Sequence, residues 1–474
     1  MKKKNNHILP ALVLTASLGL TTVSCNGFLD EMPDNRTELN TDQKIAKLLV
    51  SAYADASPNE LFELYSDNSD DSGPTYGYYK LSEQECYHWQ DTKEEYQDTP
   101  NSLWGSYYSA IAAANMALDA IEEKGNPASL DPQRGEALVC RAYCHFMLAN
   151  IFCNAYDTHA SQSLGVPYME EVETTVSPRY ERGTLEEVYR KVERDLLEGI
   201  GLISDDSYSV PKYHFTRKAA YAFAARFYLY YMKPDFSNCD RVIDFATRVL
   251  GTNPDDLLRN WEALGNLSVN GNVQADAYIA SSNEANLLIS STVSNWGAIG
   301  SDYLIGPRYF HNQTLATSET CLSSGLWGSS DYFYLKPFST NGFVASILRK
   351  SGLYEGTYLY YMPVLFSTDE TLLCRAEAYA LKKMYSQSAA DITSWQRAYT
   401  RNKSVLTPEQ INAYYNKMSF YTPFTQQTPK KQLAPTLRLR RECRKISSIA
   451  SCISVVSPPC TKGCAGPTSS DMAS

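Results

Sequence analysis

The clearest pattern of hydrophobic and polar positions lies between Trp104 and Leu250. Apolar residues recur there every three or four positions, which places them on one face of a helix. Five successive stretches with this spacing predict five amphipathic helices. Their stripes are Ile111, Asn115, Leu118 and Ile121; Leu138, Ala142, Phe146, Ala149 and Phe152; Leu185, Val188, Val192, Leu196, Ile200 and Ile203; Ala220, Ala224, Phe227 and Tyr231; and Cys239, Val242, Ala246 and Val249.

Start and stop signals support these helices. Asp131 is predicted to cap the second helix, with Pro132 at its first position. Thr184 and Glu187 form a capping box for the third, and Gly251 ends the fifth. Alanine-rich faces allow neighbouring helices to approach closely. The pattern predicts a mostly α fold, built as a tetratricopeptide-like scaffold of helical hairpins, although no strict 34-residue repeat is visible.

Regions on either side divide the chain further. Helical spacing is also present near Thr41 and returns from Thr368, so residues 41–250 and 366–435 are both assigned to the scaffold. Residues 66–98 have no period and many aromatic side chains, which predicts a structured loop insertion. Residues 251–365 are rich in glycine and aromatic residues. They are predicted to form a loop-rich ligand-binding region with short strands or single helical turns.

The N-terminus has the organisation of an export signal. Lys2 to Lys4 precede an apolar run from Ile8 to Val23, and Ser24-Cys25 is a plausible cleavage point. Residues 1–24 are therefore predicted to be a lipoprotein signal peptide, with Cys25 as the lipid attachment site and residues 25–40 as a polar tether. Simple secretion is the alternative. Stable membrane anchoring requires more than one acyl chain.

Composition describes a globular protein, with 43% hydrophobic and 20% charged residues among 474. The net charge is −10, and basic residues are concentrated in the leader and in the last 39 residues. An acidic body argues against nucleic acid as a partner. Residues 436–474 contain no aromatic residue and four of the twelve cysteines. They are predicted to be an aberrant, disordered tail, as a frame error would produce.

No catalytic signature is present, and we predict that the protein is not an enzyme and needs no cofactor or metal. The sequence has no HExxH motif, glycine-rich phosphate loop or GxSxG motif. Cys140 and Cys144 are predicted to be buried free thiols. Calcium binding by Asp67, Asp70 and Asp71 is one hypothesis, but the glycine and distal glutamate of an EF-hand are missing, which favours a solvated turn.

Aromatic residues beside acids and carboxamides are the candidates for ligand binding. A sugar ring has apolar C–H faces and a polar rim, so its site needs a flat aromatic ring and hydrogen-bonding side chains. Each ring taken singly also fits a packing role, so the hypothesis depends on the group. The predicted ligand-binding residues are Trp89, Trp296, Tyr303 and Tyr309.

Several segments together resemble the SusD/RagB family of outer-membrane nutrient-binding lipoproteins from Bacteroidetes-type bacteria. In chain order these are SCNGFLDEMP at the lipid site, LWGSYYSAIAAANMALDAI, EALVCRAYCHFMLANIFCNAYD, GVPY, GTLEEVYRKVERDL, TRKAAYAFAARFYLYY and LLCRAEAYAL. The resemblance runs from about Cys25 to Gln427. The family usually ends on a closing helix with an ER…R…GxRWxD segment, and nothing after Pro435 matches it.

The resemblance implies four tetratricopeptide repeats, an irregular ligand-binding half and an anchor at Cys25. Such proteins capture glycans, or sometimes peptides, at the surface of the outer membrane and deliver them to a TonB-dependent transporter of the SusC type. Binding residues lie in variable loops of the family, so none transfers by motif. Two alternatives remain at this stage, a helical-repeat scaffold that binds proteins and an exported carbohydrate-active enzyme.

Overall fold

The computed structural model describes residues 39–65, 70–71, 73–74, 80–175, 178–268, 273–295, 308–310, 326, 332, 334, 338–339, 342–343, 354–355 and 358–417. The chain divides into Met1–Asn40 and one compact unit that begins at Thr41, which holds nearly all of the described residues. The predicted signal peptide, lipid site Cys25 and aberrant tail all lie outside the described residues. The boundaries predicted for these three segments stay predictions.

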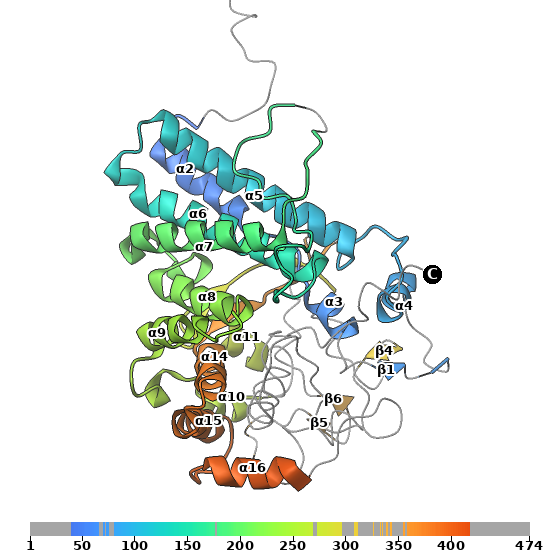
Figure 1. Ribbon diagram of the computed structural model, residues 1–474, viewed down its shortest axis with the longest axis vertical. Coiled ribbons are helices and arrows are strands. Elements are labelled where there is room, and N and C mark those ends of the chain that lie inside the picture. Colours follow the sequence, from blue (N-terminus) through green and yellow to red (C-terminus); the bar gives the residue numbers. More distant parts are fainter. Residues whose placement is uncertain are drawn as a thin grey trace, which may run out of the picture. The chain divides into compact units, whose positions relative to one another are not determined.

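The mostly α fold predicted from the sequence is confirmed. Figure 1 shows the long helices stacked one upon another, from α2 and α5 through α6, α7, α8, α9, α14 and α15 to α16. Successive helices in this order pack on one another, mostly as antiparallel hairpins. Their bounds are α2 Asp42–Leu48, α5 Pro100–Glu123, α6 Asp131–Phe152, α7 Leu185–Leu202, α8 Arg217–Tyr230, α9 Asn238–Leu250, α14 Thr368–Leu381, α15 Tyr385–Tyr399 and α16 Pro408–Lys417.

Two helix starts differ from the prediction. Helix α5 begins at Pro100, before the predicted Trp104, because the Thr99 hydroxyl accepts a hydrogen bond from the backbone N–H of Ser102 at 3.4 Å. Asp131 is the first residue of α6 and does not cap it. The short turn η2, Ala128–Leu130, runs directly into α6, so Leu130 occupies the cap position without a side-chain hydrogen bond.

The predicted capping box of α7 is present. The backbone N–H of Glu187 donates to the Thr184 hydroxyl at 3.2 Å, and the N–H of Thr184 donates to the Glu187 carboxylate at 2.9 Å. Thr184→Ala should lower the free energy of unfolding by about 1 kcal/mol, while Thr184→Ser should preserve it, because only alanine removes the hydroxyl. Urea unfolding measures both variants. An equal decrease in the free energy of unfolding for Thr184→Ala and Thr184→Ser would contradict a capping role for the hydroxyl.

A glycine pair sets the spacing between α6 and α7. A Cβ atom at Gly135 would lie 2.8 Å from the carbonyl oxygen of Gly199, and one at Gly199 would lie 2.7 Å from the carbonyl oxygen of Gly135. The two backbones therefore pack in direct contact. Helix α6 is buried on nearly every side from Gly135 to Ala149, so it is the central helix of its layer and exposes no broad polar face.

Buried ion pairs join successive layers of the stack. Arg141 of α6 pairs with Asp195 of α7 at 2.6 Å. Arg226 of α8 binds both carboxylate oxygens of Glu370 of α14, and Arg375 of α14 binds those of Asp391 of α15 at 2.8 Å. All six side chains are buried. Because an unpaired buried charge is costly, each pair fixes which helices can neighbour one another.

The loop-rich region has short strands, as predicted, in the part that the structure describes. Strand β2 (Asn286–Ile289) pairs antiparallel with β9 (Val364–Ser367), β3 (Thr292–Val293) with β8 (Tyr358–Tyr361), and β1 (Asp70–Asp71) with β4 (Tyr309–Phe310). The remaining strands are β5 Phe338–Ser339, β6 Gly342–Phe343 and β7 Tyr354–Glu355. Short helices α10, Trp261–Gly265, and α11, Val273–Ile279, complete it. Among the described residues, no helix is both long and apolar enough to cross a membrane.

The loop insertion predicted at residues 66–98 contains a helix that the sequence pattern did not indicate. This helix, α4, spans Leu81–Tyr87, and it lies near the short helix α3, Asn59–Leu64. In Figure 1 both lie beside β1 and β4, to one side of the stacked helices. Trp89, the first of the predicted ligand-binding residues, lies just beyond the end of α4.

Candidate functional site

Trp89 lies just after the end of α4 on a strained turn. Its backbone φ is +56°, in the left-handed region that residues other than glycine rarely adopt. Two hydrogen bonds fix the turn, from the N–H of Trp89 to the carbonyl of Cys86 at 3.0 Å and from the N–H of Gln90 to that of Glu85 at 2.8 Å. The turn holds the indole outward, and 46% of the Trp89 side chain surface is exposed.

Tyr65 supports the exposed indole from behind. Tyr65 caps α3, and its ring is stacked on Trp89 with centroids 4.4 Å apart and planes inclined by only 14°. We call this pair the aromatic platform. One face of Trp89 is fixed by Tyr65, so the exposed part of the indole is a rigid, flat, apolar surface, which suits the C–H face of a sugar ring.

Tyr309 lies close to the aromatic platform but in a packing position. It is 1% exposed, with its ring 4.8 Å from that of Tyr87 and 5.9 Å from that of His88. The guanidinium of Arg308 lies 5.1 Å from the same ring. In this arrangement Tyr309 supports the end of α4 and does not display its ring. A direct contact between Tyr309 and a ligand stays a prediction.

Of the three acids considered for calcium, Asp71 is paired with Arg308, and Asp67 lies outside the described residues. Both carboxylate oxygens of Asp71 accept hydrogen bonds from Arg308, each at 2.6 Å, and one also accepts from the N–H of Gly73 at 2.8 Å. These hydrogen bonds hold the pKa of Asp71 below its ordinary value, chiefly through the Arg308 guanidinium. In the part of the chain that the structure describes, no group of three or more His, Cys, Asp or Glu residues could hold a metal ion.

Trp296 and Tyr303 lie outside the described residues, and their role stays a prediction. The chain that leads to them is anchored beside the aromatic platform. The N–H of Asn295 donates to the Asp98 carboxylate at 2.8 Å, and the Gln97 amide donates to the Asn295 side chain at 3.3 Å. Asn295 is therefore bound to the segment that follows Trp89 in the sequence.

Residues 90–98, which we call the strap, return from Trp89 to α5 along the surface of α4. Buried Glu85 of α4 accepts a hydrogen bond from the N–H of Lys93 at 3.0 Å. The Glu94 carboxylate accepts from the N–H of Ser82 at 2.9 Å and from the Tyr96 hydroxyl at 2.8 Å. These contacts fix the strap, and through it the position of Trp89.

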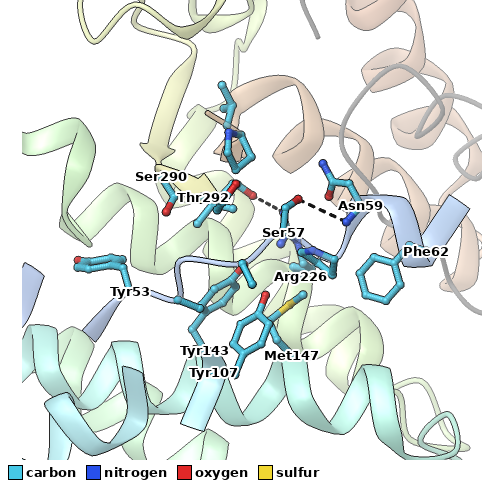
Figure 2. A pocket seen from close by; sticks show the side chains of 16 residues that line it. Tyr53, Ser57, Asn59, Phe62, Tyr107, Tyr143, Met147, Arg226, Ser290 and Thr292 are labelled. Carbon is cyan, nitrogen blue, oxygen red and sulfur yellow. Dashed lines mark hydrogen bonds between the residues drawn. The ribbon is translucent and has the colours of Figure 1, made fainter. Parts of the chain in front are cut away.

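A second candidate is a pocket inside the scaffold, which the sequence did not indicate (Figure 2). Its cavity has a volume of about 40 Å³ and is lined by side chains from the segment 53–62, from α5, α6 and α8, and from the chain around β2 and β9. Figure 2 shows Tyr107, Tyr143, Met147 and Arg226 on one side of this space, with Ser57, Asn59, Ser290 and Thr292 across it.

The charged group in this pocket already has protein partners. Arg226 is held by Glu370 and also donates to the carbonyl of Leu365 at 2.6 Å. The Asn59 amide donates to the Tyr361 hydroxyl at 3.3 Å, and its backbone N–H donates to the Ser57 hydroxyl at 3.4 Å. These contacts join the helices to the strands, so the pocket serves the scaffold, and the aromatic platform remains the better candidate for a ligand.

The cysteines offer no redox or nucleophilic site in the described residues. None of those described forms a disulfide, and Cys140 and Cys144 are buried as predicted. Burial raises the pKa of both thiols well above its ordinary value. Because a protonated thiol is a poor nucleophile and a poor metal ligand, these two cysteines act as packing residues.

The described residues form a stack of helices with one exposed, ring-stacked tryptophan held on a segment to its side. Residues 27–229 match the SusD-like family, which is described as starch-binding and associating with the outer membrane. The matched residues include several of the segments on which the resemblance to this family was based, and the fold is shared with a SusD superfamily protein from Bacteroides fragilis. No protein with curated annotation matches the chain.

Solved structures with the same fold cover most of the chain. A Bacteroides vulgatus protein described as sugar binding is 21% identical, with a TM-score of 0.57 over 81% of this chain and 84% of the other. A SusD-like carbohydrate-binding protein from the same species is 14% identical, with a TM-score of 0.57 over 79% and 78%. Surface glycan-binding protein A from Bacteroides uniformis is 14% identical, with a TM-score of 0.54 over 78% and 84%.

Proposed function

We propose that this protein is a non-catalytic, cell-surface lipoprotein that captures glycans and delivers them to a SusC-type TonB-dependent transporter in the outer membrane. The observation that carries the proposal is the aromatic platform, an exposed indole held rigidly by Tyr65 and by a strained turn. The family description as starch-binding, and the similar proteins named for sugar or glycan binding, support the same class of ligand.

Glycan binding of this kind needs no reactive group. The ring supplies apolar contact with one sugar face, and the exposed carboxamide of the adjacent Gln90 can bind its hydroxyl rim. Preorganisation favours binding because the indole loses little freedom when the ligand arrives. Retention of a weakly bound glycan would then depend on enclosure by the partner transporter and on multivalent contact.

The experiment that tests this proposal is a screen of the purified protein against immobilised glycans and peptides. Binding to one class of neutral glycan oligomers, without binding to peptides, is the expected outcome. A protein that binds peptides only would keep the capture role but change the ligand class. The absence of binding to both glycans and peptides would refute a nutrient-binding role.

Anchoring at Cys25 is a separate part of the proposal and has its own test. Cys25→Ser removes the thiol that would carry the acyl chains, so the protein should move from the membrane fraction to the soluble fraction of cells that export it. Fractionation with an antibody against the chain measures the change. A neighbouring substitution, Ser24→Ala, serves as the control and should leave the protein in the membrane fraction.

A further inference from the structure

Beneath the aromatic platform, ionisable side chains of α3, α4 and the strap meet in a buried cluster. Glu60, Glu83 and Asp98 are each less than a tenth exposed. The ammonium of Lys80, at the start of α4, lies 3.9 Å from Glu60 and 4.0 Å from Glu83. One cation therefore faces three carboxyl groups. Other titratable side chains of the same three segments surround this cluster. They are Tyr65, Glu85, Cys86, Lys93, Glu94 and Tyr96.

Three buried carboxylates beside one ammonium cannot all be ionised cheaply, because burial penalises each charge and like charges repel. The oxygens Glu60 Oε2 and Asp98 Oδ1 are both buried, and neither has a donor among the described residues. The two carboxyl groups lie within hydrogen-bonding reach of each other, so the two orphaned oxygens can be satisfied by one shared proton. Two carboxylates can only accept, so a proton must lie between them.

The surroundings decide which residue holds this proton. Asp98 accepts hydrogen bonds from the N–H of Asn295 at 2.8 Å and from the Ser294 side chain, and both favour its anionic form. The cation that favours ionised Glu60 is Lys80, whose ammonium lies at 3.9 Å, too far for a hydrogen bond. Burial, followed by the charge of Asp98, raises the pKa of Glu60 well above its ordinary value. The proton therefore lies on Glu60, which donates to Asp98.

This hydrogen bond joins the two supports of the aromatic platform. Glu60 belongs to α3, the helix that ends at Tyr65, and Asp98 ends the strap that begins after Trp89. Asp98 has a φ of +72°, so the strap lies between two residues in the left-handed region. We propose that the proton shared by Glu60 and Asp98 locks the aromatic platform to the scaffold, and that losing it as pH rises weakens ligand binding. The effect on ligand binding depends on the proposed glycan-binding function, whereas the shared proton and its effect on stability do not.

The sign of the pH effect follows from linkage. A carboxyl whose pKa is raised by folding contributes stability that is fully present below the pKa of the unfolded chain, about 4.3 for glutamate. That contribution is lost as the pH rises through the folded pKa. The protein should therefore lose stability on the alkaline side, where ionised Glu60 would repel Asp98.

The substitution Glu60→Gln tests the lock without any ligand. Its amide has the shape of a protonated glutamic acid and donates to Asp98 at every pH. As the pH is raised from about 5 to about 9, the urea concentration at the unfolding midpoint should decrease more for the wild type than for the variant. The difference between the two midpoints should grow with pH. Glu95→Gln, at an exposed position of the strap, is the matched control. Its urea midpoint should change with pH as that of the wild type does. If the urea midpoints of Glu60→Gln and the wild type changed with pH in the same way, the shared proton would be refuted.

A second variant and a second readout complete the test. If Glu60→Gln fails to fold, Asp98→Asn replaces it, because its oxygen still accepts from Asn295 and its amide donates to Glu60. With any glycan that binds, the wild-type Kd should rise by about threefold or more across the same pH range, and the Glu60→Gln Kd should stay constant. A failure to bind any glycan would refute the proposed function and leave the stability result standing. A pH-independent wild-type Kd would refute the coupling to the platform.

Discussion

Trp89→Ala should weaken glycan binding by about thirtyfold or more, which corresponds to about 2 kcal/mol. The substitution removes the exposed indole and leaves Tyr65 without its stacked partner at 4.4 Å. A buried aromatic contact at the centre of a site usually supplies a large share of the binding free energy, and no other described ring is held in this way. Isothermal titration with a glycan oligomer identified by the screen measures the change in Kd.

The matched control is Trp104→Ala on α5. Trp104 is 37% exposed, similar to Trp89, and its ring packs on that of Phe152 with centroids 5.0 Å apart. Its loss should leave the Kd unchanged within error. If the two alanine variants bound the glycan equally well, the ligand would contact some other surface of the protein.

Arg226→Ala should cause the largest loss of stability, about 3 to 5 kcal/mol of the free energy of unfolding. The guanidinium donates to both oxygens of Glu370 at 2.6 and 2.5 Å and lies 4.0 Å from the ring of Phe366. Its removal would leave the buried Glu370 carboxylate without this partner at the contact between α8 and α14. Since domains are typically stable by about 5 to 15 kcal/mol, the variant should be close to unfolded at ambient temperature.

A surface ion pair provides the comparison. Arg248 and Asp244 form an exposed pair one helical turn apart on α9 at 3.0 Å, and Arg248→Ala should cost about 0.3 to 0.5 kcal/mol. Thermal unfolding followed by circular dichroism measures both variants. Similar losses for Arg226→Ala and Arg248→Ala would show that burial does not make the first pair important.

The helices that could be predicted are those in which one face is apolar. The stripes of α7 and α9 and the caps at Thr184 and Gly251 were visible because burial and hydrophobicity coincide there. Helix α15 was missed because its buried face mixes apolar residues with polar ones, and Ser388, Asp391, Thr393 and Gln396 are all inside. Asp391 is buried there because Arg375 of α14 neutralises it. Helix α4 was missed for a related reason, since it buries Ser82, Glu83 and Glu85.

The candidate site was predictable only in part. Composition indicated Trp89 because a sugar site needs a flat ring beside polar groups, and the structure shows that ring exposed. The role of Tyr65 could not be predicted, because its contact with Trp89 joins two segments through the positive φ turn. The packing position of Tyr309 depends on the pairing of β1 with β4 across more than 200 residues, which no local pattern reveals.

The most direct measurement is a calorimetric titration of the full chain with a glycan oligomer, followed by chromatography of the recovered ligand. Saturable heat with the glycan recovered at its original length is the result expected of a protein that displays a ring and breaks no bond. Shortened glycan in the recovered sample, or the absence of binding to every glycan tested, would contradict the account.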